Sequence, residues 1–448
     1  MDRFEIRGGT RLTGKLTVKG AKNAALPLMC ACLLTDEPVI MRDVPDLADI
    51  ASMRKLLGTL GVEVEYTPDL RLNAPGGITR MHATDRTACH AEYEIVRTMR
   101  ASISTLGPML ARRGEARISL PGGCAIGERP VDLHIRGMAA LGAQISLQGG
   151  DIVAKAPKGA GGVPRLKGAR VFLGGPFGST VLGTANVMCA ATLAEGTTLI
   201  EMAACEPEVV DLANMLIAMG ARITGAGSPR IIIEGVRELH GVDHRVMADR
   251  IEAGTYMCAA AITNGDITLE NCPIDALMAT LDHLHHMGVT VTWDQGMDPL
   301  RTTARVTASR VLNPIEATTQ PHPGFPTDLQ AQLMAVLTLA DGNSVLTERI
   351  FTERFLHVAE LSRMGAKLYR QGATVVVSGV RKLVGAPVMA SDLRASACLV
   401  LAGLAAEGQT IVNRVYHLDR GYDRMDERLK LLGADIVRVN DREPAAVA

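Results

Sequence analysis

Three cations lie at the starts of predicted helices that are otherwise apolar. Lys22 begins the run KNAALPLMC, Arg100 precedes ASISTLGPML, and Arg394 lies in SDLRASACLVLAG. The start of a helix carries free N–H groups and a partial positive charge, so a cation is unfavourable there unless an anion accompanies it. The three residues therefore predict a site for a phosphorylated or carboxylated ligand.

Two other helix starts carry short polar side chains, Ser179 in one and the adjacent Thr327 and Asp328 in the other. Serine, threonine and aspartate are favoured at N-caps, where a side-chain oxygen accepts a backbone N–H. Capping explains these three residues without any ligand, and a role in the predicted anion site is the alternative. Capping does not explain the three cations.

Cys124 differs from the other eight cysteines because it lies in a polar loop, PGGCAIGERP. Glycines on both sides allow a ligand to approach the backbone closely, and Arg129 favours the thiolate. Loop cysteines are often inert, so a structural role remains open. The cysteines show no metal-ligand spacing and the histidines do not cluster with them, so we expect no metal and no cofactor.

Composition limits the classes of partner. The chain has 448 residues, a formal net charge of −1 and 3% aromatic residues. A nucleic-acid or anionic-membrane binder would show a basic excess, so we expect neither partner. The first residues lack a signal peptide, and the longest apolar run near them, LPLMCACLL, is too short to span a bilayer. We therefore expect a cytoplasmic protein.

The elements that must position these residues repeat six times along the chain. Each repeat contains an Ala-rich apolar helix, a polar turn and a β run, followed by an amphipathic helix that ends in glycine and a second β run. The six terminal glycines, expected to form left-handed helix caps, are Gly61, Gly142, Gly220, Gly288, Gly365 and Gly433. The polar turn lies 23 to 28 residues before each of these glycines.

The repeats predict an α/β fold with two domains of three units each. A unit of roughly 70 residues is too small to bury its own core, so the units must pack together with the apolar helices inside. We expect domain I to comprise residues 1–21 and 246–448, and domain II to comprise residues 22–245. The first strand-like segment, DRFEIRGGTRLTGKLTV, is expected to pair with the C-terminal units.

Long motifs from about residue 4 to residue 440 resemble those of the UDP-N-acetylglucosamine 1-carboxyvinyltransferases (the MurA enzymes), a group of enolpyruvyl transferases. The motifs are KNAALP, TMRASI, LPGGCAIGERPVDLH, PHPGFPTDLQAQ, ERFLHVAELSRMGA, SDLRASACLVLAG and HLDRGYDR. The resemblance implies a two-domain inside-out α/β barrel of the EPSP synthase type, with the active site in the cleft between the domains. It also implies transfer of enolpyruvate from phosphoenolpyruvate to the 3′-hydroxyl of UDP-N-acetylglucosamine, with release of phosphate. This reaction is the first committed step of peptidoglycan synthesis.

The resemblance assigns roles to residues that match the motifs. Lys22, Arg129 and Arg420 match the ligands of phosphoenolpyruvate, and Arg394 matches another cleft arginine. Cys124 matches the proton donor, and Asp328 matches the residue that bonds the 3′-hydroxyl, which we expect to be the base. A further set matches substrate ligands: Asn23, Arg100, Pro130, Val131, Asp132, Leu133, Thr180, Val181 and Ile350.

The chain departs from the family near Thr180, where Leu182 replaces a glycine. We expect the larger Leu182 side chain to shift the contact of Thr180 and Val181 with the uridine phosphates. Arg354 also matches a family arginine, but a structural salt bridge explains it equally well.

Three functions stay open at this point. The first is an active carboxyvinyltransferase, expected to be a monomer and to be alkylated at Cys124 by the epoxide fosfomycin, as the resemblance implies. The second is a non-catalytic paralogue that binds a UDP-sugar and regulates a pathway. The third is a transferase of the same fold acting on another acceptor, such as shikimate 3-phosphate. Two features of the chain argue against shikimate 3-phosphate as the acceptor. EPSP synthases have Lys-Ser where this chain has Lys22-Asn23, and they lack the Gly-Gly-Cys loop that contains Cys124.

Overall fold

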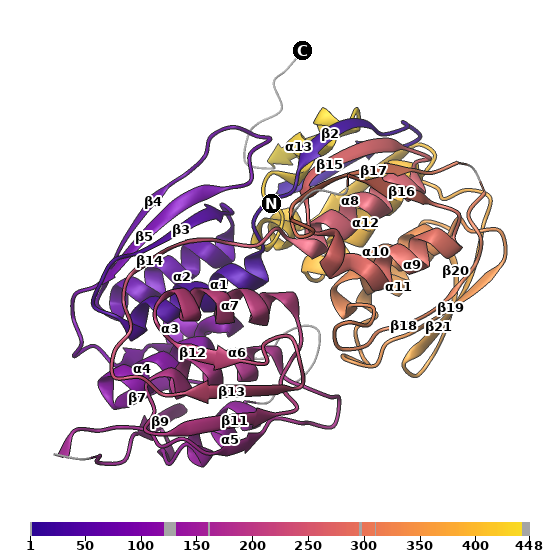
Figure 1. Cartoon of the computed structure of the whole chain (residues 1–448). Helices are drawn as coiled ribbons and strands as arrows, with labels where there is room; N and C mark the ends of the chain where they lie inside the picture. Colours follow the sequence, from indigo (N-terminus) through magenta and orange to yellow (C-terminus); the bar gives the residue numbers. More distant parts are fainter. Residues whose placement is uncertain (1, 121–130, 160–161, 295–297, 310, 441–448) are drawn as a thin grey trace.

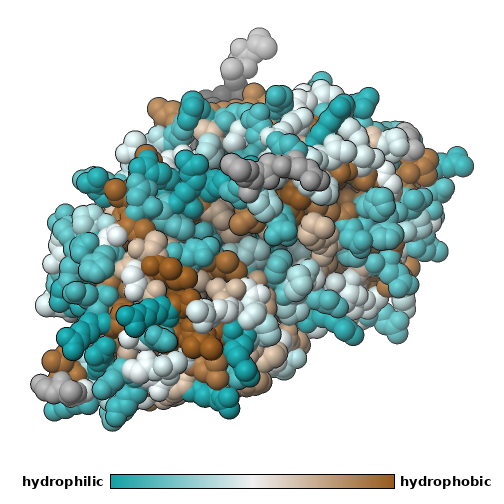
Figure 2. Space-filling model, viewed as in Figure 1, coloured by the Kyte–Doolittle hydropathy of each residue, from teal (hydrophilic) through white to brown (hydrophobic). Residues whose placement is uncertain are grey.

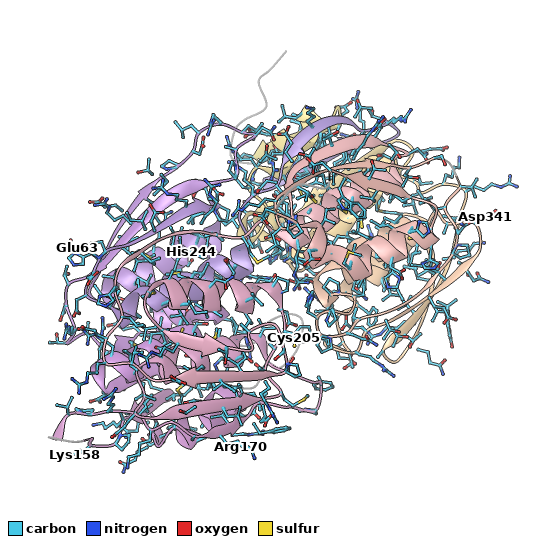
Figure 3. The ribbon with its side chains drawn as sticks, in the orientation of Figure 1. Glu63, Lys158, Arg170, Cys205, His244 and Asp341 are labelled. Atoms are coloured by element: carbon cyan, nitrogen blue, oxygen red, sulfur yellow. The ribbon has the colours of Figure 1, made fainter. Side chains whose placement is uncertain are left out.

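The computed structural model describes residues 2–120, 131–159, 162–294, 298–309 and 311–440. The backbone forms two lobes that lie side by side (Figure 1). We call the lobe that carries α1 and α7 the first lobe, and the lobe that carries α8 and α12 the second lobe. In Figure 3, Glu63, Arg170 and His244 lie on the first lobe and Asp341 lies on the second.

Six four-stranded sheets in the described residues share one strand order. In each sheet, two neighbouring strands run parallel at one edge and the remaining pairs are antiparallel. The first lobe has β14-β3-β5-β4 (Val242–Arg245, Val39–Val44, Gly77–Ala83, Val62–Thr67), β6-β7-β9-β8 (His90–Ala91, Glu115–Ser119, Asp151–Lys155, Gln144–Gln148) and β10-β11-β13-β12 (Arg170–Phe172, Thr197–Glu201, Arg230–Glu234, Arg222–Thr224). The second lobe has β2-β15-β17-β16 (Thr13–Thr17, Asp266–Cys272, Thr302–Thr307, Thr290–Trp293), β18-β19-β21-β20 (Glu316–Thr318, Asn343–Thr347, Thr374–Ser378, Lys367–Gln371) and β22-β23-β1-β24 (Pro387–Met389, Gln409–Asn413, Asp2–Arg7, Asp435–Asn440). The prediction of six repeated units, three in each half of the molecule, is confirmed.

The Ala-rich segments form the buried helices, as predicted. They are α1 (Lys22–Ala31), α4 (Leu106–Arg113), α6 (Val181–Thr192), α8 (Arg250–Ile262), α10 (Gln330–Leu337) and α12 (Leu393–Ala405). Every residue of α8 and α10 is buried. Small side chains allow these helices to pack closely, so each lobe has a core of helices with sheets outside it.

A short 3₁₀ helix precedes two of the buried helices. These are η2 (Arg100–Thr105) before α4 and η5 (Thr327–Leu329) before α10. Other short helices in the described part of the chain are η1 (Cys32–Leu34), α3 (Tyr93–Val96), η4 (Ile274–Leu277) and η6 (Val415–Arg420).

The amphipathic segments form the outer helices. They are α2 (Ala48–Thr59), α5 (Asp132–Ala140), α7 (Pro207–Ala218), α9 (Met278–His286), α11 (Leu356–Arg363) and α13 (Met425–Leu431). Each is followed by the glycine that the sequence predicts, and all six glycines have φ between 75° and 105°. A side chain disfavours this left-handed backbone, which explains glycine at each position.

The N-terminal strands belong to the second lobe, as predicted. β1 pairs with β23 and β24, and β2 pairs with β15. The chain then crosses to the first lobe beside the point where it returns. Ala21 N donates to Met247 O at 2.7 Å, and Asp249 N donates to Lys19 O at 2.8 Å. The expected domain boundaries at residues 21 and 245 lie beside these two crossings.

Two separate hydrophobic clusters fill the lobes. The first contains residues from Ala21 to Met247 together with Ala276. The second contains residues from Phe4 to Val18 and from Ala248 to Ile436. The surface is mixed, and hydrophobic side chains gather on the lobe that carries α7 (Figure 2). Exposed Ile217 and Ile232 belong to this lobe.

Two features are absent from the described part of the chain. None of its helices has the length and apolar character needed to cross a membrane. It also contains no group of three or more His, Cys, Asp or Glu side chains that could hold a metal ion.

Candidate active site

Asp49 of α2 lies between two of the predicted cationic residues. Its Oδ2 accepts a hydrogen bond from Lys22 Nζ at 3.1 Å, and its Oδ1 accepts one from Arg420 Nε at 2.9 Å. Lys22 begins α1 in the first lobe, and Arg420 ends η6 in the second. The carboxylate of Asp49 therefore holds the two cations together across the lobes.

A second carboxylate, that of Asp328 in η5, is bound by three side chains. Its Oδ2 accepts hydrogen bonds from Asn23 Nδ2 at 3.3 Å and Arg394 Nη2 at 3.0 Å, and its Oδ1 accepts one from Arg354 Nη1 at 2.8 Å. The side chains of Arg394 and Arg354 are 4% and 7% exposed, whereas that of Asp328 is 25% exposed. Asn23 comes from α1, so this cluster also joins the lobes.

The cations determine the protonation of the site. Burial alone raises the pKa of Asp328, but the charges of Arg394 and Arg354 outweigh burial and hold this pKa well below its usual range. Burial lowers the pKa of Lys22, and Asp49 opposes this effect. Asp328 is therefore ionised at neutral pH, and the contact with Asp49 helps Lys22 to keep its proton.

These contacts correct one step of the sequence argument. The argument requires an anionic ligand for the cations at the helix starts. Instead, Asp49 supplies the counter-charge of Lys22, and Asp328 supplies that of Arg394. Asp49 and Asp328 therefore accept hydrogen bonds from the same cationic groups that would bind an anionic substrate.

The capping explanation of Ser179, Thr327 and Asp328 is wrong. No side chain caps η5 or α10. Thr327 Oγ1 instead donates to Glu348 Oε2 at 2.8 Å, while the Asp328 side chain binds arginines. The side chains that do cap buried helices are those of Thr180 at α6, Asp249 at α8 and Asp392 at α12.

A buried hydroxyl network fixes Arg394. Its Nη1 donates to Tyr422 Oη at 3.2 Å, and Tyr422 Oη shares a 2.8 Å hydrogen bond with Thr255 Oγ1. Gln332 Nε2 donates to Tyr422 Oη at 3.2 Å and to the backbone oxygen of Asp328 at 2.9 Å. The network ties Arg394 to the segment that carries Asp328.

Four of the six predicted helix starts meet at these carboxylates. Asn23, Asp328 and Arg394 link the starts of α1, η5 and α12. Lys22 N donates to Asp249 Oδ2 at 3.2 Å, which adds the start of α8. The starts of η2 and α6 carry residues that were predicted to contact the nucleotide-sugar.

Those residues lie in the first lobe. Asp132 and Leu133 begin α5, and Val131 directly precedes this helix. Thr180 caps α6, where its Oγ1 accepts from Gly183 N at 3.2 Å, and Val181 is the first residue of the helix. α5 packs against α6, so the two predicted segments are neighbours.

Arg100 begins η2 and lies within electrostatic range of α5. Burial, together with the charge of Arg100, lowers the pKa of His134 in α5 to about 4. η2 also packs against α1 and α6. Arg100 thus lies on the side of the nucleotide segments.

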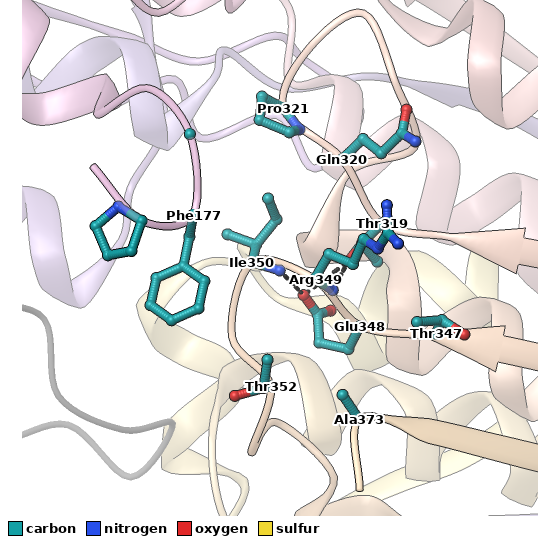
Figure 4. Close-up of a pocket in the computed structure, with 12 residues that line it drawn as sticks. Phe177, Thr319, Gln320, Pro321, Thr347, Glu348, Arg349, Ile350, Thr352 and Ala373 are labelled. Carbon is teal, nitrogen blue, oxygen red and sulfur yellow. Dashed lines mark hydrogen bonds between the residues drawn. The ribbon is translucent and has the colours of Figure 1, made fainter. Parts of the chain in front are cut away.

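Ile350 lines a cavity of about 470 Å³ formed by segments of both lobes. Residues 176–178 of the first lobe lie on one side, and residues 319–321, 347–350, 352 and 373 of the second lobe form the rest of the lining (Figure 4). Glu348 holds this wall: its carboxylate accepts from Thr319, Thr327 and the backbone N of Ile350. Because Thr327 precedes Asp328, Glu348 connects the cavity wall to the Asp328 segment.

Three of the predicted site residues fall outside the described part of the chain, namely Cys124, Arg129 and Pro130. Their roles stay predictions. All the other predicted site residues are placed as given above.

The sequence did not predict three residues of the candidate site, namely Asp49, Glu348 and Tyr422. Asp49 occurs in a segment that reads as an outer helix with a charged face, and Glu348 follows an ordinary strand. Tyr422 does lie in HLDRGYDR, so its proximity to Arg420 was the one available signal.

Comparison with known proteins identifies the family. The family model of EPSP synthase (3-phosphoshikimate 1-carboxyvinyltransferase) matches residues 6–429. The chain belongs to the EPSP synthase family. It is thus a member of the enolpyruvyl transferases, consistent with transfer of enolpyruvate from phosphoenolpyruvate.

Solved structures in the EPSP synthase family share the fold. The enolpyruvyl transferase NikO from Streptomyces tendae has a TM-score of 0.85 at 26% identity, covering 98% of this chain and 99% of that chain. An EPSP synthase from Acinetobacter baumannii has a TM-score of 0.75 at 20% identity, covering 98% and 100%. The second similarity supports the fold alone, because its sequence identity is low.

Proposed function

We propose that this enolpyruvyl transferase acts on UDP-N-acetylglucosamine, moving enolpyruvate from phosphoenolpyruvate to the sugar 3′-hydroxyl. The observation that carries the proposal is the pair of carboxylates at the lobe junction. Asp328 is held by Asn23 and two buried arginines, and Asp49 is held by Lys22 and Arg420. Apart from Asp49, these residues lie in motifs that resemble those of UDP-N-acetylglucosamine 1-carboxyvinyltransferases.

Phosphoenolpyruvate carries a phosphate and a carboxylate on three carbons and needs several cationic partners. In the proposed complex, Lys22, Arg394 and Arg420 bind these anionic groups, with Arg129 as a further ligand. The charge of Arg394 holds the pKa of Asp328 low. An anionic group of the substrate bound to Arg394 offsets part of this charge. The pKa of Asp328 then rises, and the carboxylate becomes a stronger base.

The reaction is an addition followed by an elimination. The oxygen of the sugar 3′-hydroxyl adds to C2 of phosphoenolpyruvate, and Asp328 accepts the proton of this hydroxyl. At the same time, C3 of phosphoenolpyruvate gains a proton from Cys124. Loss of a proton from C3 and of phosphate from C2 then gives the enol ether. Asn23 Nδ2, now bonded to Asp328, lies where it can bind the substrate or the intermediate.

We further propose that the catalytic unit is a monomer of two domains, residues 1–21 with 246–448 and residues 22–245. The two paired crossings at Gly20 and Ala248 provide the hinge. Closure around both substrates excludes water from the reacting atoms.

Shikimate 3-phosphate is the second candidate acceptor, because the matching family model is that of 3-phosphoshikimate 1-carboxyvinyltransferase. Phosphate release from phosphoenolpyruvate, measured with each acceptor in turn, separates the two. We expect release that depends on UDP-N-acetylglucosamine. Release with shikimate 3-phosphate alone supports the second candidate, and release with neither, from folded protein that binds the UDP-sugar, supports a regulatory paralogue.

A further inference from the structure

A two-residue hairpin presents an aromatic side chain at the cavity beside Ile350. Gly175 N donates to Gly178 O at 2.8 Å, and Gly178 N donates back to Gly175 O at 3.2 Å. Pro176 and Phe177 form the tip between them, and Gly178 adopts a left-handed backbone with φ +103°. Phe177 is 59% exposed, and the two hydrogen bonds join the glycines on either side of the tip.

The hairpin contacts the segment predicted to bind the nucleotide. Arg136 of α5 donates from Nη1 to Gly174 O at 3.3 Å. A Cβ on Gly175 would lie 3.3 Å from Leu133 Cδ1, so glycine lets the hairpin lie directly against the start of α5. At the other end, a Cβ on Gly178 would lie 3.1 Å from Pro321 Cγ in the second lobe. The hairpin therefore lies between Leu133 and the second-lobe wall of the cavity.

The facing wall carries one available positive charge. Glu348 and Arg349 are the charged residues among those that line the cavity in the described chain. The Glu348 carboxylate already accepts four hydrogen bonds, from two threonine hydroxyls and two backbone N–H groups. The exposed Arg349 side chain makes no ion pair with any described residue. Phe177 lines the opposite side of the same cavity, where its ring lies beside Ile350 (Figure 4).

We infer that Phe177 is a specificity-determining residue, whose ring stacks on the planar base of the acceptor nucleotide while Arg349 binds its phosphates. An aromatic face accepts a flat heterocycle, and a guanidinium is well suited to phosphate oxygens. The hairpin lies against Leu133 and ends two residues before Thr180, so a nucleotide bound to those residues reaches the hairpin. The inference rests on the proposed function, because it takes the acceptor to be a nucleotide-sugar.

The test compares Phe177→Ala and Phe177→Trp with the wild type. Binding constants are measured for UDP, UDP-N-acetylglucosamine and N-acetylglucosamine 1-phosphate, which lacks the base. We expect Phe177→Ala to weaken the binding of both UDP ligands about 10-fold and Phe177→Trp to retain it, because stacking on a ring is lost only in the first variant. N-Acetylglucosamine 1-phosphate should bind all three proteins equally.

Two controls complete the design. Tyr369→Ala removes another exposed aromatic side chain, on β20 and outside the cavity, and should change none of the constants. Arg349→Gln should weaken UDP binding. KM for phosphoenolpyruvate should stay unchanged in the Phe177 variants.

Unchanged UDP binding in Phe177→Ala overturns the inference, as does an equal loss of N-acetylglucosamine 1-phosphate binding. The experiment distinguishes failure of the proposed function from failure of the inference about Phe177. Wild-type protein that binds UDP through Phe177 but releases no phosphate with the UDP-sugar contradicts the proposed function and supports the inference. Wild-type protein that binds no UDP ligand contradicts both.

Discussion

Asn23 Nδ2 donates a 3.3 Å hydrogen bond to Asp328 Oδ2, which joins two residues 305 positions apart in the chain. One residue lies on α1 of the first lobe and the other on η5 of the second. Asn23 Nδ2 and Arg394 Nη2 both donate hydrogen bonds to Asp328 Oδ2. The proposed base is therefore satisfied by protein donors, which a substrate hydroxyl must partly replace.

Replacing Asp49 by asparagine should shift the alkaline limb of activity to lower pH. Asp49 favours the protonated form of Lys22, whose pKa burial already lowers. Without this carboxylate Lys22 loses its proton at lower pH, so the alkaline limb of kcat/KM for phosphoenolpyruvate should move down by about one pH unit. Glu63→Gln, at an exposed acid on β4, is the matched control. An unshifted limb in Asp49→Asn would mean that Asp49 does not support Lys22.

Replacing Arg354 by glutamine should shift the acid limb of activity to higher pH. Arg354 donates to Asp328 Oδ1, and its charge helps to hold the pKa of Asp328 low. Its removal raises that pKa, so ionised Asp328 is lost at higher pH and the acid limb of kcat/KM should move up by about one unit. The exposed Arg370→Gln variant should leave the profile unchanged. If both variants gave the wild-type profile, Asp328 would not be the base.

Fosfomycin should modify the protein once, at Cys124. Mass spectrometry after treatment with millimolar fosfomycin should show a single adduct together with loss of activity. The buried cysteines are poor competitors, because burial raises the pKa of thiols such as Cys30, Cys189 and Cys258. Cys205→Ser should still be labelled and Cys124→Asp should resist. An unmodified, active wild-type protein would contradict the assignment of Cys124.

The free energy of unfolding should fall between pH 6.5 and 4. Burial, with a contribution from Arg100, lowers the pKa of His134 to about 4, so the folded state keeps this imidazole neutral while the unfolded chain takes up a proton. Stability therefore decreases as pH falls through this window, by up to about 3 kcal/mol for this residue. Urea titrations should show a shallower decrease for His134→Gln, and the exposed His285→Gln variant should follow the wild type. A wild-type slope in His134→Gln would show that His134 does not carry the effect.

The repeated architecture was predictable because it depends on local signals. Glycine caps such as Gly61 and Gly433 and the Ala-rich buried helices occur at regular spacing, and a left-handed cap needs no distant partner. The pairing of the N-terminal strands with the last units followed from their place in the repeat. Lys22, Asn23 and Arg394 could be named as candidate site residues from their positions at helix starts and from the motifs that contain them.

The partners of these residues could not be predicted in the same way. Asp49 lies on an outer helix beside Arg54 and Lys55, and its position between Lys22 and Arg420 depends on how α2 meets η6. Phe177 reads as part of a glycine-rich turn until the hairpin and the facing wall are seen together. Such contacts join segments far apart in sequence, where neither spacing nor periodicity carries a signal.

Identification of the product tests the central claim most directly. The protein is incubated with phosphoenolpyruvate and UDP-N-acetylglucosamine, and the sugar nucleotide is analysed by mass spectrometry and NMR, with Asp328→Asn as the matched control. The account predicts that wild type adds one enolpyruvyl group to the 3′-oxygen of the sugar while one phosphate is released, and that Asp328→Asn forms this product roughly 100-fold more slowly or worse. An unaltered UDP-sugar, or equal rates for both proteins, would contradict it.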